Sequence, residues 1–191
     1  MIESGLPIYP QELSRWAYTS RFISSNIPGG AKVLDIGFGS RYWPENYEII
    51  SLGIKPENTY VHDIQHDNLA ERIEERFDFI TMFEVIEHLE DPKKALGNIH
   101  SLGTSSCLFI GSTPNGRDPY YLLTGSKHDD HEIVLTKASL RKALVDEGFQ
   151  VLEIKPRILP LKIPGRTLIR NMDSIFPFWG RHLFWKAKRD D

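Results

Sequence analysis

The chain has 191 residues and a net charge of −3, which is enough for one domain with a sizeable core and short for two. Its 40% hydrophobic and 26% charged residues are typical of a globular protein, and no apolar run approaches the roughly 20 residues that cross a bilayer. A single cysteine, Cys107, excludes an internal disulfide, and residues 1–7 lack the basic start and apolar run of a signal peptide, so we expect a cytoplasmic protein.

Hydrophobic periodicity predicts helices that alternate with short apolar strands. Apolar residues at helical spacing predict a helix over 11–26, and the apolar run at 31–37 is typical of a buried parallel strand. Residues 47–53 are expected to be the remnant of a helix that ends at Gly53. Further strands are expected at 59–64, 77–83, 107–112, 149–155 and 182–187, and further helices at 69–75, 91–102 and 137–147.

This alternation predicts an α/β fold, with a doubly wound, mostly parallel sheet and helices on both faces. We expect a single domain over 1–191, with an N-terminal helical segment (1–30) and an irregular insertion (156–180) before the last strand. Ligands of such sheets bind beyond the carboxyl ends of the strands. The segments expected at this edge are Asp35–Gly39, Asp63, Phe83–His88 and Thr113–Asn115.

The segment Val33–Ser40 is typical of a nucleoside-binding turn that leaves a buried strand. Gly37 and Gly39 allow a sharp turn and let a ligand approach the main-chain N–H groups. Tyr42 occupies the third glycine position of a dinucleotide motif, and no P-loop pattern is present. Asp35 would repel a pyrophosphate but suits a ligand that carries a sulfonium and an ammonium group.

Leu34–Gly39 resembles the first motif of class I S-adenosylmethionine-dependent methyltransferases, although Ser40-Arg41 stand where many members continue to a third glycine. Phe77–Pro92 resembles the fourth-strand motif of the branch that contains ubiquinone-biosynthesis O-methyltransferases. Ser112–Asn115 and the Thr136…Leu140…Gly148-Phe149 pattern resemble the same branch, so that the similarity runs from about Ala31 to Ile154. The resemblance implies S-adenosylmethionine as cofactor and a seven-stranded, Rossmann-like sheet with an antiparallel last strand.

The resemblance also implies which residues hold the cofactor. Asp63 would accept hydrogen bonds from the ribose hydroxyls, with Asp67 as the rival or an adenine-side contributor. The interval from Asp35 to Asp63 is longer than the roughly 20 residues expected of a nucleotide-binding unit. Phe83 and Glu84 would border the methionine portion. The full set of expected cofactor residues is Asp35, Gly37, Phe38, Gly39, Asp63, Ile64, Phe83 and Glu84.

Methyl transfer needs a base near the acceptor, and two histidines are candidates. His88 follows the fourth-strand motif closely enough to face the reaction centre, although a structural hydrogen bond is an equal alternative. His131 belongs to the polar loop 128–132, where substrate-specific groups are expected. The predicted function is O-methylation of a small-molecule, lipid-linked or glycan-linked acceptor.

Two other functions are considered. Glu84, Glu87 and His88 have i, i+3, i+4 spacing and, with His131 or His128, would supply ligands to a divalent metal, as in the similar small-RNA 2′-O-methyltransferases. The wider family carries Glu-x-x-Glu-His without metal, and the basic residues form no stripe, so we predict no metal and disfavour nucleic acid. The other alternative is a non-catalytic S-adenosylmethionine-binding regulatory or scaffold protein, because the short chain leaves little room for substrate-capping insertions.

The C-terminal part of the chain is basic and aromatic. Residues 155–191 carry nine Lys and Arg against three Asp, a net charge of +6, whereas the rest of the chain carries −9. Residues 175–180, with Arg166, Arg170 and Arg181, are expected to form a lid over an anionic or lipid-like acceptor, a membrane-surface contact, or simple packing on the sheet. The sequence indicates no oligomeric state.

Overall fold

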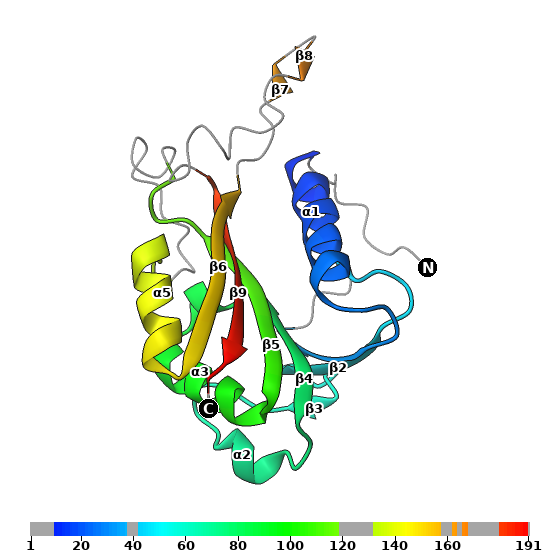
Figure 1. Cartoon of the computed structure of the whole chain (residues 1–191), viewed down its shortest axis with the longest axis vertical. Helices are drawn as coiled ribbons and strands as arrows, with labels where there is room; N and C mark the ends of the chain where they lie inside the picture. The colour runs from blue at the N-terminus through cyan, green and yellow to red at the C-terminus, as the bar shows by residue number, and fades with distance from the viewer. Residues whose placement is uncertain are drawn as a thin grey trace.

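The computed structural model describes residues 10–37, 42–118, 132–157, 162–163, 166–167 and 180–190. Its centre is a seven-stranded sheet with the strand order β3-β2-β1-β4-β5-β9-β6 (Figure 1). The strands are β1 (Lys32–Ile36), β2 (Glu48–Gly53), β3 (Tyr60–Val61), β4 (Phe77–Phe83), β5 (Gly103–Pro114), β6 (Phe149–Arg157) and β9 (His182–Arg189), and a separate antiparallel pair is formed by β7 (Lys162–Ile163) and β8 (Arg166–Thr167).

The direction of the strands confirms the predicted fold class. The five strands from β3 to β5 are parallel, whereas β9 is antiparallel to both of its neighbours, β5 and β6. The helices of the described residues are α1 (Pro10–Asn26), α2 (Leu69–Arg72), α3 (Pro92–Leu102) and α5 (Lys137–Asp146), and η2 (Ile86–His88) is a 3-10 turn. The chain therefore has the doubly wound α/β architecture of a mostly parallel sheet with an antiparallel last strand.

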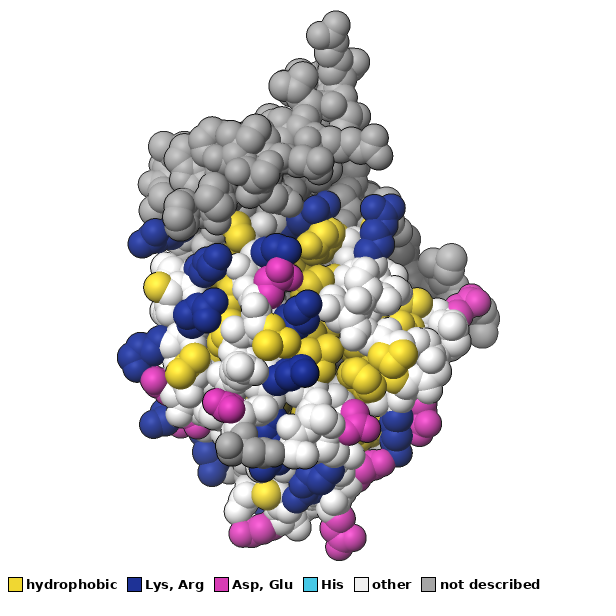
Figure 2. All heavy atoms as spheres, in the orientation of Figure 1, with side chains coloured by type: hydrophobic (Ala, Val, Ile, Leu, Met, Phe, Trp, Pro, Cys, Tyr) yellow, Lys and Arg dark blue, Asp and Glu magenta, His cyan; other side chains and the backbone are white. Residues whose placement is uncertain are grey.

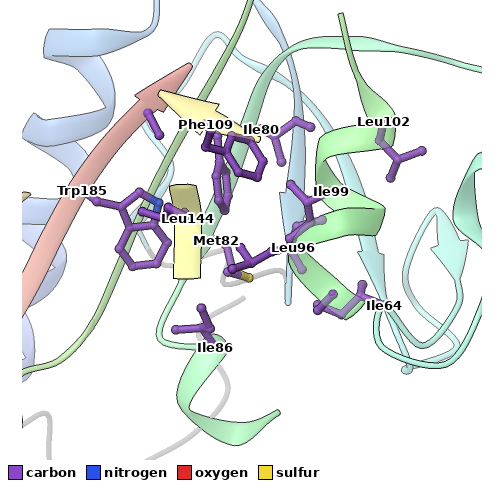
Figure 3. Packing of buried hydrophobic residues seen from close by; sticks show 14 of the residues in the cluster. Ile64, Ile80, Met82, Ile86, Leu96, Ile99, Leu102, Phe109, Leu144 and Trp185 are labelled. Atoms are coloured by element: carbon purple, nitrogen blue, oxygen red, sulfur yellow. The ribbon is translucent and has the colours of Figure 1, made fainter. Parts of the chain in front are cut away.

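Each face of the sheet has its own hydrophobic cluster. On the face covered by α3 and α5, Leu96 and Leu144 pack against Phe109 and Trp185 (Figure 3). On the opposite face, Ile23 of α1 packs with other strand residues and with Phe184, which directly precedes Trp185 on β9. Adjacent strand residues point to opposite faces, so one strand serves both clusters. Burial of each large apolar side chain stabilises the fold by about 1.5–3 kcal/mol.

The expected helix remnant at 47–53 is wrong, because these residues form β2. Glu48–Leu52 pair in parallel with Lys32–Ile36 of β1, and Leu52 is fully buried. The β-branched pair Ile49-Ile50 fits a pleated strand, whereas Gly53, which suggested a helix end, only closes the strand. As a consequence, the strand expected at 59–64 is the third strand, reduced to Tyr60–Val61 at the edge of the sheet.

The other boundaries differ by a few residues. The helix expected at 69–75 ends at Arg72, and β5 begins at Gly103, earlier than expected. Helix α3 begins with Asp91, whose carboxylate accepts from Lys94 N–H, and α5 begins with a capping box between Thr136 and Ser139.

No helix of the described residues is long and apolar enough to cross a membrane. The single-domain organisation over 1–191 stays a prediction.

Candidate active site

The carboxyl ends of the parallel strands form one edge of the sheet, which is the upper edge in Figure 1, where β6 ends and β9 begins. Gly37 follows β1 with a φ of +74°, and a Cβ atom there would overlap Val85, which follows β4. Glycine is therefore required both by the backbone conformation and by the close approach of the next loop. Phe38 and Gly39 lie outside the described residues.

Asp35 is fully buried and accepts hydrogen bonds from protein groups. Thr81 Oγ1 donates over 2.5 Å, Trp43 Nε1 over 3.0 Å and the Tyr42 hydroxyl over 3.2 Å. Tyr42, which replaces the third glycine of a dinucleotide motif, thus helps to hold this carboxylate. These bonds give Asp35 a role in fixing the chain that follows the glycine turn. Its predicted contact with the cofactor stays a prediction.

Asp63 follows β3, which is the outermost strand on its side of the sheet. The sequence interpretation placed Asp63 one strand closer to β1. Its carboxylate accepts from Gln65 N–H over 3.0 Å and lies 2.9 Å from His66 Nδ1. Burial opposes its ionisation, but these two partners hold the pKa of Asp63 below its ordinary value. The strand next to β1 ends at Gly53, and no carboxylate follows directly, since Ile54 and Lys55 come next.

Other expected cofactor residues lie partly in the core. Ile64 is 5% exposed and packs in the cluster beneath α3 (Figure 3), which gives its side chain a structural role. Phe83 ends β4 and packs edge-on against Tyr42, with 5.2 Å between the ring centroids. Phe83 thus lies beside Tyr42 at the carboxyl end of β4, and its predicted contact with the methionine portion stays a prediction.

Glu84 comes directly after β4 and has a φ of +54°, which is rare for a residue with a side chain. Ser112 Oγ donates to its Oε1 over 2.6 Å, and Oε2 lies 3.2 Å from His182 Nε2 and 3.6 Å from the Arg15 guanidinium. Burial opposes ionisation, but His182, Ser112 and Arg15 lower the pKa of Glu84. Glu84 is therefore a charged carboxylate at this edge of the sheet.

Glu87 lies one turn later and is 2% exposed. Thr113 Oγ1 donates to its Oε2 over 3.0 Å, and its Oε1 lies 4.0 Å from His88 Nε2. Burial, together with the negative charge of Glu84, raises the pKa of Glu87 to about 8. Two neighbouring carboxyl groups thus hold different protonation states at neutral pH: Glu84 is ionised, and Glu87 carries a proton. His88 is 38% exposed and lies at the surface of this cluster.

His182 and Arg15 were missed in the sequence. His182 is the first residue of β9. Its place at the start of the expected last strand is the sequence feature that could have identified it as a site residue. The described residues contain no group of three or more His, Cys, Asp and Glu arranged to hold a metal ion. His128 and His131 lie outside the described residues, so the predicted role of His131 stays a prediction.

The site fits S-adenosylmethionine in two respects. Gly37, with its positive φ, presents no side chain at the end of β1, and the carboxylates of Asp63 and Glu84 are both held ionised near the same edge. A cationic ligand with a ribose diol needs close backbone approach and acidic partners. These residues therefore suit the predicted cofactor.

Comparisons with known proteins agree with this geometry. Residues 11–154 match the family model described as a methyltransferase domain. The fold is similar to that of an S-adenosylmethionine-dependent methyltransferase from Archaeoglobus fulgidus, with 20% identity, a TM-score of 0.65 and 94% of each chain covered. It is also similar to a putative methyltransferase from Haloferax volcanii in complex with the Trm112 activator, with 18% identity, a TM-score of 0.65, and 94% of this chain and 91% of that chain covered.

A third similar structure is the N-methyltransferase NodS from Bradyrhizobium japonicum WM9 in complex with S-adenosylhomocysteine. It has 16% identity and a TM-score of 0.61, with 97% of this chain and 91% of that chain covered. No curated protein matches the sequence. Because the family model matches most of the chain, the protein belongs to the methyltransferase domain family and is an S-adenosylmethionine-dependent methyltransferase.

Proposed function

We propose that this enzyme methylates an oxygen of a small-molecule, lipid-linked or glycan-linked acceptor, as in the branch that contains ubiquinone-biosynthesis O-methyltransferases. The observation that carries the proposal is the cluster after β4, in which His88 lies beside the protonated, buried Glu87. A hydroxyl group must lose its proton as it is methylated, and imidazole is the side chain that most often accepts one.

The residues of the chain divide the remaining tasks. When bound, the cofactor supplies a methyl group on a positively charged sulfonium. Gly37, with Phe38 and Gly39, would allow close backbone approach, and Asp63 would accept hydrogen bonds from the ribose hydroxyls. Phe83 and Glu84 would border the methionine portion, and Asp35 holds the chain after the turn through Tyr42 and Trp43.

The reaction is an in-line displacement. The bound cofactor would supply its activated methyl group to the acceptor oxygen and leave as the neutral thioether. The acceptor proton passes to His88 Nε2, with His131 as the alternative base. Alignment of the two reactants lowers the barrier of such a reaction by up to about 7–11 kcal/mol.

The proposal also includes a cytoplasmic location. Cys107, the lone cysteine, is buried in the core, and burial raises the pKa of its thiol to about 12. A thiol held in this form is inert, which suits a structural residue in a reducing compartment.

Turnover of labelled S-adenosylmethionine on a panel of phenols, alcohols and amines tests the proposal. We expect label on oxygen, and we expect His88→Ala to lower kcat by about 10²–10⁴-fold while S-adenosylhomocysteine still binds in calorimetry. Label on nitrogen alone would contradict the oxygen assignment. Tight cofactor binding without turnover would favour the regulatory or scaffold alternative, and loss of activity in EDTA would favour the metal-dependent RNA alternative.

A further inference from the structure

A cavity of about 270 Å³ lies at the same edge of the sheet, on the side covered by α5. We call it the α5 pocket. It lies between the end of β5, the start of α5 and the adjoining ends of β6 and β9. Its lining residues are Asn115, Arg117, Thr136, Lys137, Ala138, Arg141, Pro156 and Leu183. The pocket is therefore built by four elements that meet only in the folded chain.

Three cationic side chains belong to the residues that line this pocket. Among the described residues, Arg117, Lys137 and Arg141 form no ion pair, whereas Lys142 on the same helix lies 2.5 Å from Asp146. Figure 2 shows Lys and Arg side chains gathered along the side of the molecule where α5 lies. Like charges held together without counter-charges create a positive potential that favours an anion.

The floor of the pocket is fixed by Asn115, which is 2% exposed. Its side-chain amide donates to Gly180 O over 2.8 Å, and its Oδ1 accepts from Arg117 N–H over 3.1 Å. These bonds hold the chain that carries Arg117 against the start of β9. The partial positive charge at the N-terminus of α5 adds to the field of the three cations.

The remaining lining is apolar. Pro156, Leu183 and Ala138 present no charge, so a bare inorganic ion would leave much of the cavity unfilled. We infer that the α5 pocket binds an organic anion, with a carboxylate or phosphate against the three cations and an apolar body against Pro156 and Leu183. Apolar walls with a few convergent polar groups are typical of small-molecule sites.

This ligand is the acidic portion of the methyl acceptor, an assignment that rests on the proposed function. Thr113 of β5, which donates to Glu87, lies two residues before Asn115, which directly follows the strand, so the end of β5 joins the candidate base cluster to the pocket. An acceptor with an acidic group and a hydroxyl would thus be held at one end and methylated at the other.

The inference is tested by titrating the ¹⁵N-labelled full chain with benzoate, phenyl phosphate and the neutral analogue benzamide, followed by amide NMR shifts. We expect saturable shifts at Ala138 and Leu183 with at least one anion and none with benzamide. Arg141→Glu should raise the Kd of that anion by about tenfold, equivalent to one unit of log K. Lys142→Glu, one residue along the same helix, is the matched control and should leave the Kd within about twofold.

The outcomes separate the ligand classes and the two proposals. Binding of benzoate alone assigns a carboxylate, and binding of phenyl phosphate alone assigns a phosphate. Equal shifts with benzamide, no saturable shift at these amides, or equal effects of the two substitutions would overturn the inference. Binding is measured without S-adenosylmethionine, so its failure leaves the methylation proposal standing, and a failure of turnover leaves the pocket standing.

Discussion

Glu84 Oε2 lies 3.2 Å from His182 Nε2, although Glu84 follows β4 and His182 opens β9. Because β9 runs antiparallel to β5, its first residue lies opposite Pro114, at the edge where the parallel strands end. Arg15 of α1 reaches the same carboxylate. The pair thus joins the last strand and the first helix to the loop that carries the candidate base.

Glu84→Gln keeps the shape of this side chain but removes its charge, so His182 and Arg15 lose their carboxylate partner. We expect the free energy of unfolding to fall by about 1–3 kcal/mol, measured by urea denaturation. Glu74→Gln is the matched control, because Glu74 is exposed and its side chain has no partner among the described residues. Equal losses in the two variants would show that the pair contributes nothing.

Gly37→Ala should destabilise the protein through two effects, a backbone φ of +74° and overlap with Val85. Gly30→Ala isolates the first effect, because Gly30 has a φ of +82° and nothing within 4 Å of a new Cβ. We expect a loss of about 1 kcal/mol for Gly30→Ala and about 2–4 kcal/mol for Gly37→Ala in thermal or urea unfolding. A Val85→Ala background should recover part of the difference, and no recovery would rule out the steric explanation.

The raised pKa of Glu87 makes stability depend on pH. The folded chain keeps a proton up to about pH 8, whereas the unfolded chain releases it near the ordinary value for glutamate. The stabilisation is therefore complete below the ordinary value and is lost as the pH rises toward 8, by at most about 1.4 kcal/mol per pH unit.

Glu87→Gln removes this proton uptake, so its unfolding free energy should decline less with pH than that of the unmodified protein. Urea unfolding in steps of about one unit between about pH 5 and about pH 8 measures both profiles. Glu84 stays ionised over this window, since its pKa is lowered, and contributes no slope there. Parallel profiles would contradict the assignment of a neutral Glu87.

Asp63→Asn tests the predicted ribose partner. The amide retains one acceptor oxygen but loses the charge that His66 faces. We expect the Kd for S-adenosylhomocysteine to rise by about tenfold in calorimetry, because a charge-assisted hydrogen bond becomes a neutral one. Asp146→Asn, on α5, is the control and should bind as the unmodified protein does. If both variants bind equally well, the ribose hydroxyls have another partner.

The strands and helices that were predicted well are those whose apolar pattern is repeated several times. The run 77–83 is confirmed as β4, and the helix that Asp91 caps ends at Leu102 as expected. Residues 47–53 were misread because a short apolar segment that ends in glycine suits either a helix end or a strand. Pairing with β1 decided the outcome, and that contact is invisible in a local pattern.

In the candidate site, too, local patterns were readable from the sequence, and contacts between distant segments were not. The glycine and acidic residues at strand ends were predicted from the local spacing that carries the motif, and their roles stay predictions. Arg15 and His182 were not found, since α1 and β9 reach the cluster only through the order of the strands in the sheet. Asp35 lies in β1, and its donors Thr81 and Trp43 come from positions that no motif links to it, so its predicted contact with the cofactor stays a prediction.

The place of β9 between β5 and β6 also determines when β6 can pair during synthesis of the chain. In the described sheet, β6 pairs only with β9, so it has no strand partner until the ribosome has added residues 182–189. At about 5–20 residues per second, the nascent chain holds that unpaired edge for a second or more. During this interval β6 presents an unpaired strand edge, after the other five strands can already pair.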